Sequence, residues 1–393
     1  MDRKILHVDV NNAFLSWLAV YKLKNGEKLD IRTIPAIIGG DEEARKGIVL
    51  AKSTKAKEFG IVTGEPIYFA KRKCPQIQVF QGNFKIYREY SNNLYKLLLH
   101  YTDKIERYSI DECFLDMTEY LMKDTIENKA EEISRRIKNE LGFTVNVGIS
   151  NNKLLAKMAS DFEKPDKIHT LYSYEIREKM WNLPITELFM LGKKSVPKLN
   201  KMGIKKIGDL AQKDRQILIK NFGKYGNLIW EYANGIDNSP VNYQYEKPKS
   251  ISNSVTLPMD TCNIEKIQKT LLELTEQVSY RLRKYELLAN TVNIQLRSKD
   301  FVDTSHQGKM DFATSSTKHI YAKAKALLEE LYKADTMIRL IGIRVDNLEE
   351  KEQRQISLFG REENEKQERL DNTMDKLKEK YGFDIVTYAT KKI

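Results

Sequence analysis

The sequence has few of the residues from which disulfide frameworks and zinc sites are built. Its 393 residues include three cysteines, which lie far apart and form no CxxC pair. An odd number of isolated cysteines excludes a disulfide scaffold and favours a reducing compartment. The five histidines are equally scattered and show no metal-ligand spacing.

Long apolar runs are also missing. No uninterrupted apolar stretch approaches the roughly 18 residues that a membrane-spanning helix requires. The N-terminal segment "MDRKILHVDV" enters a strand-like pattern at once, and its apolar stretch is too short for a signal peptide. We therefore expect a soluble, cytoplasmic protein without membrane contact.

Acidic residues are in the minority. Asp and Glu number 55 against 66 Lys and Arg, which gives a formal net charge of +11. This excess favours a polyanionic partner. The hydrophobic content of 41% is ordinary for a globular protein, and the length exceeds what one compact core accommodates. Several domains are therefore expected.

The pattern of apolar residues changes along the chain. Strand and helix signals alternate over residues 1–170, which indicates an α/β or α+β unit. Short helices dominate 174–237, and a polar, proline-bearing linker follows at 235–250. Residues 251–348 return to alternating strands and helices, and the remaining tail is highly charged apart from one apolar island, "QISLF". No internal repeat is present.

Three carboxylates stand in apolar, strand-like surroundings. Asp111 and Glu112 are adjacent in "RYSIDECFLDM", and Asp9 lies on the first expected strand. Burying an ionised carboxylate costs several kcal/mol unless a cation compensates it. Hard divalent cations prefer clustered carboxylate oxygens, and two ions about 3.5–4 Å apart can hold both reacting oxygens of a phosphoryl transfer. A tight turn at "SIDE" would let both neighbouring carboxylates reach one place, since side chains alternate along a flat strand. Each acid taken alone also fits a solvated strand-end residue.

Several motifs resemble those of one enzyme family. The segments "HVDVNNAF" (7–14) and "YSIDECFLD" (108–116) resemble the two carboxylate motifs of the Y-family lesion-bypass DNA polymerases, in their bacterial form. "GISNNKLLAKMASDFEKPD" is similar to the palm-helix motif of that family, and "LGKKSVPKLNKMGIKKIGDLA" to its thumb helix–hairpin–helix. "QISLF" resembles a bacterial sliding-clamp-binding peptide. Together the motifs follow the family's order over nearly the whole chain.

The resemblance implies an α+β multidomain fold shaped like a right hand. It implies a ferredoxin-like palm at residues 1–12 and 83–170, small fingers at 13–82, a helical thumb at 171–237, a linker at 238–249, a DNA-binding α/β little finger at 250–348 and a charged tail at 349–393.

The same resemblance assigns roles at the catalytic end of the palm. Asp9, Asp111 and Glu112, with the backbone carbonyl of Val10, would bind two Mg²⁺ ions, for which Mn²⁺ would substitute. Asn11 stands where the family usually has a second acid, which is not a metal ligand. The nucleotide would be met by Asn12, Ala13, Phe14, Thr54, Lys57 and Lys164, with the ring of Phe14 as the steric gate against a ribose 2′-OH.

Some positions depart from the family pattern. Thr54 and Lys57 replace a tyrosine and an arginine that touch the triphosphate, and lysine lacks the bidentate fork of arginine. We therefore expect weaker nucleotide binding than in a typical relative, partly offset by Lys52. Ile48 and Leu50 align with the roof over the template base, where their bulk predicts better tolerance of small lesions than of bulky adducts.

The expected macromolecular partners are primer–template DNA and the sliding clamp. Implied DNA contacts are Lys193, Lys194, Lys198, Lys249, Ser252, Ser254, Arg297 and Lys299. Implied clamp contacts are Gln355, Ile356, Ser357, Leu358 and Phe359. Because such DNA contacts are made to phosphate, binding should be salt-sensitive and largely independent of sequence. Met190, which replaces the first glycine of the usual thumb hairpin, puts the hairpin's turn geometry in question.

We expect a monomeric translesion DNA polymerase that adds dNTPs to a primer 3′-OH with low fidelity and without proofreading. Two alternatives remain at this point. A nucleotide cyclase can use a similar palm and carboxylates, and its turnover would not depend on DNA. A catalytically idle, clamp-tethered DNA-binding protein is suggested only by Thr54, and retention of the three carboxylates and Lys164 argues against it.

Overall fold

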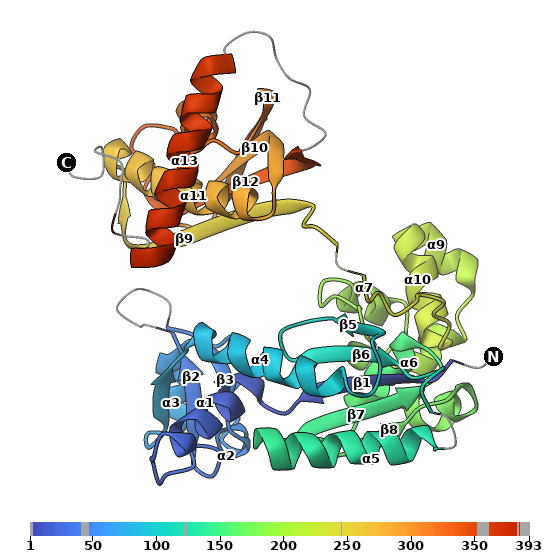
Figure 1. The fold of residues 1–393 in the computed structure, drawn as a ribbon. Coiled ribbons are helices and arrows are strands. Elements are labelled where there is room, and N and C mark those ends of the chain that lie inside the picture. Colours follow the sequence, from blue (N-terminus) through green and yellow to red (C-terminus); the bar gives the residue numbers. More distant parts are fainter. Residues whose placement is uncertain are drawn as a thin grey trace. The chain divides into compact units, whose positions relative to one another are not determined.

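The computed structural model describes residues 3–40, 47–121, 124–244, 246–351, 361–382 and 385. They fall into two compact units, one formed by the described residues up to Gln244 and the other by those from residue 246 on. Helices and strands mix in both units, as the expected α+β class requires (Figure 1). Among the described helices, none has the length and apolar character needed to cross a membrane.

A five-stranded sheet forms the centre of the first unit. Its order is β5-β6-β1-β7-β8, with bounds Ile105–Arg107, Glu112–Asp116, Ile5–Val10, Val145–Ser150 and Ile168–Thr170. Every residue of β1 and β7 is buried, because these inner strands are covered on both faces. β1 runs antiparallel to both neighbours, β6 and β7.

Different helices cover the two faces of this sheet. Leu6, Val8 and Val10 point into a core shared with α1 (Ala13–Lys24), α4 (Phe84–Leu98) and α5 (Ile126–Arg136), which a π-helical turn extends over Ile137–Leu141. The alternate residues of β1 face α6 (Lys153–Ser160). α6 lies very close to the sheet at Gly148, where an added Cβ would come within 1.9 Å of the Ala156 carbonyl oxygen.

A second, small sheet lies in the same unit. Its order is β3-β2-β4, with bounds Val49–Lys52, Ala36–Gly39 and Gln78–Gln81. Two short helices accompany it, α2 (Thr54–Glu58) and α3 (Ile67–Lys73). The side chain of Ser53 caps α2 by accepting from the Ala56 N–H, so β3 leads directly into this helix.

The remainder of the first unit is helical, as the sequence pattern predicts. It contains the short turns Ser173–Glu175, Ile176–Met180 and Ile185–Glu187, then α7 (Val196–Lys201), α8 (Ile207–Ala211), α9 (Arg215–Phe222) and α10 (Lys224–Ala233). Their apolar residues form one core with Leu154, Leu155 and Met158 of α6. α6 therefore joins the helical part to the central sheet.

The second unit is a four-stranded antiparallel sheet with helices on one face. Its order is β11-β10-β12-β9, with bounds Asp303–Thr314, Leu287–Ser298, Ile338–Glu350 and Ser250–Thr261. α11 (Ile264–Lys284) and α12 (Thr317–Leu331) pack on the face that carries the buried apolar residues. Alternation along the strands leaves the opposite face to polar side chains.

A further helix, α13 (Arg361–Tyr381), is attached to this unit through ion pairs. Arg283 of α11 makes a bidentate pair with Asp375, with N–O distances of 2.5 and 2.8 Å, and lies 3.7 Å from Asp371. Lys378 and Glu276, both almost fully buried, approach to 3.5 Å. The interface of α13 is thus held largely by charged groups.

Candidate active site

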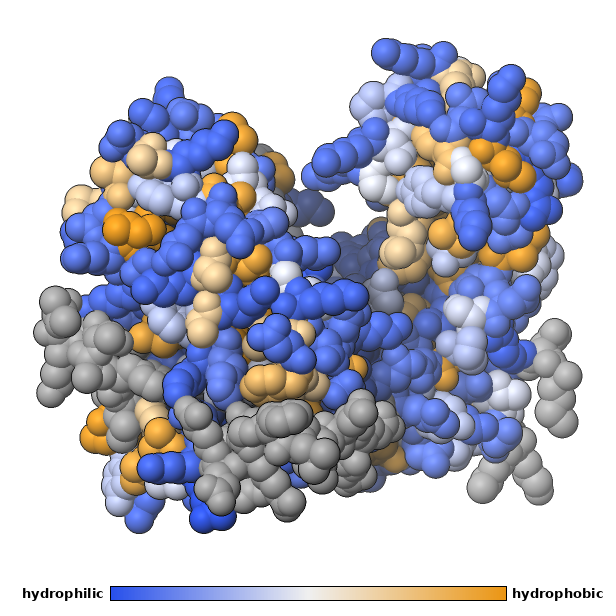
Figure 2. Space-filling view, turned by 90° about the horizontal axis from the view of Figure 1, so that it is seen from above, coloured by the Kyte–Doolittle hydropathy of each residue, from blue (hydrophilic) through white to orange (hydrophobic). Residues whose placement is uncertain are grey.

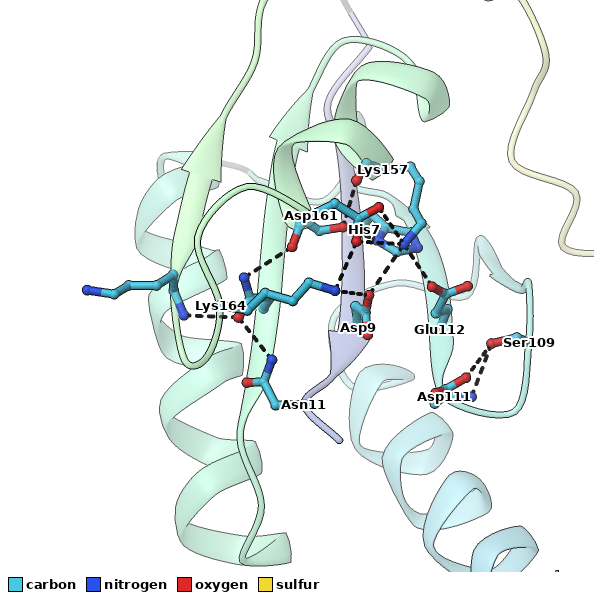
Figure 3. Close-up of polar contacts among 12 residues, drawn as sticks. His7, Asp9, Asn11, Ser109, Asp111, Glu112, Lys157, Asp161 and Lys164 are labelled. Atoms are coloured by element: carbon cyan, nitrogen blue, oxygen red, sulfur yellow. Dashed lines mark hydrogen bonds and ion pairs between the residues drawn. The ribbon is translucent and has the colours of Figure 1, made fainter. Parts of the chain in front are cut away.

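Asp9 and Glu112 are direct cross-strand neighbours at the ends of β1 and β6. Asp9 is 7% exposed, so its carboxylate depends on protein partners. Asp111 precedes β6 in a tight turn, where the Tyr108 and Ser109 N–H groups both donate to the Glu112 carbonyl. The expected turn at "SIDE" is therefore present, and it brings the three acids to one end of the sheet (Figure 3).

Two lysines lie among these carboxylates. Lys157 of α6 places its Nζ 2.8 Å from Glu112 Oε1 and 3.3 Å from Asp9 Oδ2. Lys164, in the loop after α6, approaches the same Asp9 oxygen to 2.7 Å. Asp161 pairs with both ammonium groups, at 3.1 Å from Lys157 and 2.9 Å from Lys164. One connected network of ion pairs thus covers the end of β1.

Sequence reasoning named Lys164 but missed Lys157 and Asp161. Both missed residues lie within the segment identified as a palm-helix motif, and their spacing of four residues places them on one helix face. That spacing was an available signal. It could not reveal that the face meets Asp9, because this depends on how α6 packs on the sheet.

Burial and charge oppose each other in this network. Burial raises the pKa of Glu112 above its usual value, while the Lys157 ammonium works against that rise. Burial by itself lowers the pKa of Lys157, but Asp9, Asp161 and Glu112 outweigh it, and the net pKa is raised. Burial also lowers the pKa of Lys164, but Asp9 and Asp161 outweigh it, and the net pKa is raised. Both lysines therefore stay charged at neutral pH.

The three carboxylates offer the oxygen ligands that a divalent cation prefers, although the Lys157 ammonium lies between those of Asp9 and Glu112. Within the described part of the chain, no group of three or more His, Cys, Asp or Glu side chains has the arrangement of a metal site. Lys157 bridges Asp9 and Glu112, while Asp111 Oδ1 accepts a 2.6 Å hydrogen bond from the Ser109 hydroxyl. Oxygen donors clustered at one strand end are still the set that hard divalent ions prefer.

A cavity of about 330 Å³ opens beside the carboxylates. It lies where the end of β1, the start of α1, the β3–α2 connection and the Lys164 loop meet. Its lining contains all the residues expected to meet a nucleotide, together with two of the acids and Val10: Asp9, Val10, Asn12, Ala13, Phe14, Thr54, Lys57, Asp111 and Lys164. Leu50 also lines it, whereas Ile48 is not among the lining residues and is 43% exposed.

Phe14 presents a rigid ring to this cavity. The ring stacks on Tyr87 with a centroid distance of 4.5 Å and an interplanar angle of 13°, and it also packs against Phe84 and Trp17. Lys52, which was expected to support nucleotide binding, already has a partner within the protein. Its ammonium donates to the Ile61 carbonyl at 2.7 Å, and burial lowers its pKa.

Two buried amides hold the loop that carries Lys164. Asn11 donates from Nδ2 to Asn146 Oδ1 at 3.0 Å, and its Oδ1 accepts from the Asp166 N–H at 2.9 Å. Asn146 donates to the Ser160 and Glu163 carbonyls at 3.1 and 2.8 Å. The residue that replaces the family's usual acid therefore has a defined structural partner.

The candidate DNA contacts in the helical part differ in their exposure and in the partners they already have. Lys193 and Lys194 are exposed in the turn before α7. Lys198 instead donates to the Asn221 carbonyl, and its Nζ lies 4.5 Å from the Phe222 ring centroid. Met190 adopts the left-handed conformation with φ of 65°, so methionine takes the conformation expected of the missing glycine.

The polar face of the four-stranded sheet carries two shallow grooves. Lys249, Ser252 and Ser254 line them, as do residues that sequence reasoning did not name: Asn293, Gln295, Lys309 and Arg344. Neither Arg297 nor Lys299 lines either groove, and Arg297 pairs bidentately with Asp303 at 2.8 Å.

Polar and charged side chains dominate the surface in Figure 2, and apolar ones form small patches. The predicted clamp peptide, 355–359, lies outside the described residues.

Comparison with known proteins gives consistent matches over nearly the whole chain. Residues 8–161 match the impB/mucB/samB family, and residues 248–358 match the impB/mucB/samB family C-terminal domain. DNA polymerase IV of Clostridium acetobutylicum is 50% identical over 386 residues, covering 98% of this chain and 97% of that protein. DNA polymerase IV of Acetivibrio thermocellus is 37% identical, with coverages of 98% and 96%. A solved Y-family DNA polymerase chimera aligns with a TM-score of 0.77 and 26% identity, over 88% of this chain and 99% of the chimera.

Proposed function

Since this chain belongs to the impB/mucB/samB family, the Y-family DNA polymerases, we propose that Asp9, Asp111 and Glu112 hold the divalent metal ions of its reaction. The protein is a translesion DNA polymerase that acts on DNA and deoxynucleotides. Enzymes of this family generally use divalent metals, and we assign two Mg²⁺ ions to this site. The observation that carries the proposal is the convergence of the three acids at one end of the sheet, beside the cavity that Asp9, Asp111 and Lys164 line.

The chain's own groups divide the work of nucleotide addition. Lys164 supplies a point charge for the triphosphate. The ring of Phe14, supported from behind by Tyr87, lies against the sugar and excludes a 2′-OH. Thr54 and Lys57 line the same cavity but offer a shorter and less directional contact to phosphate than tyrosine and arginine. When bound, the metal ions lower the pKa of the primer 3′-OH and neutralise the developing charge.

The remaining parts of the chain would hold the DNA. We assign residues 1–12 and 83–170 to the palm, 13–82 to the fingers, 171–237 to the thumb and 250–348 to the little finger. Lys193, Lys194 and the polar face of the second unit's sheet would contact the DNA backbone, which predicts strong salt dependence. We further propose that 355–359 binds the sliding clamp, and that the enzyme is monomeric and works in the cytoplasm, where its DNA substrate is.

Primer extension tests the assignment of the acids. Wild-type protein, the double variant Asp111→Ala/Glu112→Ala and the control Asp103→Ala are compared on an undamaged template with dNTPs, after chelation and addition of Mg²⁺, Mn²⁺ or Ca²⁺. Asp103 is a matched acid outside the cavity that pairs with Tyr120. We expect Mg²⁺ and Mn²⁺ to restore extension by the wild type and the control, and neither to restore it in the double variant. Extension by the double variant at the wild-type rate would overturn the assignment.

A further inference from the structure

Lys157 is buried in the middle of the proposed metal-binding carboxylates. Its residue is 7% exposed, and its Nζ contacts Asp9, Glu112 and Asp161 at 3.3, 2.8 and 3.1 Å. Figure 3 shows its side chain descending from α6 onto the same end of the sheet that carries the acids. A fixed positive charge thus contacts two of the three carboxylates that are proposed to ligate metal.

We propose that Lys157 is a built-in countercation that competes with divalent metal for Asp9 and Glu112. It thereby keeps the metal affinity of the nucleotide-free site low. The proposal rests on the proposed function, because it requires those acids to be metal ligands. An ammonium in contact with a carboxylate oxygen offsets the negative potential that would attract a metal ion, and it repels an incoming dication. Lys157 is therefore a positioning residue, since it acts through the carboxylates that it contacts.

The charges at the site explain why a nucleotide would relieve this competition. Among the described residues, Lys157 and Lys164 pair with three carboxylates, those of Asp9, Glu112 and Asp161, and Asp111 adds a fourth at the same end of the sheet. A triphosphate brings further negative charge and acceptor oxygens, to which Lys164, which lines the cavity, can turn from Asp9 and Asp161. Metal and nucleotide should then bind cooperatively, and by reciprocity each should strengthen the other to the same extent.

The test measures metal binding directly and does not depend on turnover. Free Mn²⁺ is followed by electron paramagnetic resonance during titration of the wild type and Lys157→Met, with and without a non-hydrolysable dNTP analogue. We expect Lys157→Met to bind Mn²⁺ at least about tenfold more tightly without nucleotide, because charges at these distances interact strongly in a partly buried site. The enhancement of Mn²⁺ binding by the analogue should shrink in the same variant.

Lys153→Met is the matched control. Lys153 begins the same helix, is also largely buried, and pairs with Glu106 at 2.7 Å, outside the carboxylate cluster. Its replacement removes a comparable ion pair and should leave Mn²⁺ affinity at the wild-type value. An equal gain in both variants would contradict the proposal, because it would show a general charge effect.

A second substitution covers the possibility that Lys157→Met does not fold. Lys157→Gln retains a hydrogen-bonding side chain, and Mn²⁺ should raise its melting temperature more than that of the wild type, since at a given concentration a ligand that binds the folded state more tightly stabilises it more. Unchanged Mn²⁺ affinity in the folded variants would refute the role of Lys157. That role is refuted equally if neither variant folds at any Mn²⁺ concentration, because this result indicates a purely structural residue. If Asp9→Asn and Glu112→Gln leave wild-type Mn²⁺ binding intact, the metal site itself is misassigned.

Discussion

Replacing Asn11 by aspartate would restore the acid that the family usually carries, yet the structure predicts that it damages this protein. Asn11 is 6% exposed and donates through Nδ2 to Asn146 Oδ1 at 3.0 Å. An aspartate cannot donate when ionised, so a carboxylate oxygen would face the Asn146 acceptor. Asn146 cannot turn its amide over without losing its own bonds to the Ser160 and Glu163 carbonyls.

The size of the effect follows from these contacts. One hydrogen bond is lost, worth about 1 kcal/mol, and an acceptor is left facing a buried negative charge, which costs roughly another 1–3 kcal/mol. The bonds from Thr144 and the Asp166 N–H are retained and limit the damage. We therefore expect Asn11→Asp to destabilise the first unit by about 3 kcal/mol at pH 7.

Urea unfolding followed by tryptophan fluorescence measures this loss. All three tryptophans, Trp17, Trp181 and Trp230, lie in the first unit, so their signal reports that unit alone. Burial would raise the pKa of the aspartate introduced at position 11 above its unfolded value of about 3.9. The penalty is then absent below that value and grows as the pH rises toward the folded pKa, so the deficit should be smaller at pH 5 than at pH 7.

Asn12→Asp provides the control, since Asn12 is exposed and immediately precedes α1, where a negative charge is favourable. We expect it to change stability by less than about 0.5 kcal/mol. Because the Asn11 network holds the loop that carries Lys164, Asn11→Asp should also raise the KM for dNTP. Wild-type stability of Asn11→Asp at both pH values would refute the role assigned to the paired amides.

Three further predictions concern other parts of the chain. Thr54→Tyr should lower the KM for dNTP in primer extension, and an unchanged KM would show that this position does not limit nucleotide binding. Gly148→Ala should destabilise the first unit by about 3 kcal/mol in the same urea assay, because its Cβ would meet the Ala156 carbonyl oxygen at 1.9 Å. Asp375→Asn should increase hydrogen exchange across α13, because it loses the bidentate pair with Arg283. Asp371→Asn should leave hydrogen exchange unchanged, since Asp371 lies 3.7 Å from Arg283 and burial raises the pKa of its carboxyl. Equal exchange in both variants would contradict the unequal roles of these two acids.

Local signals in the sequence predicted much of the secondary structure. The segment "NNKLLAKMASDFEKP" indicates a helix capped by asparagine, and α6 is capped by Asn152, whose Oδ1 accepts from the Leu155 N–H at 2.8 Å. The short basic helix at "TKAKEFG" is α2, and Gly60 follows it with a positive φ of 71°. Caps and breakers act over a few residues, so they can be identified without knowledge of the fold.

The candidate site was predictable only where a motif carries it. Asp9, Asp111, Glu112 and Lys164 were named from the sequence because each lies in a recognisable segment. Arg344 and Lys309 were not named, since exposed basic residues are common and nothing local indicates which face of the sheet they share. Their place beside the grooves depends on the pairing of β12 with β9 and β10.

The sequence by itself determined the order of strands and helices, the family and the acids on which the proposed chemistry depends. Tertiary structure alone decided that Lys157 lies between Asp9 and Glu112, and that Asn11 meets Asn146 rather than solvent. The physical reason is the distance along the chain over which each kind of interaction acts. Backbone preferences and motifs act between neighbours in the chain, whereas these contacts join residues more than forty positions apart, and only the packing of α6 and the pairing of β1 with β6 and β7 bring them together.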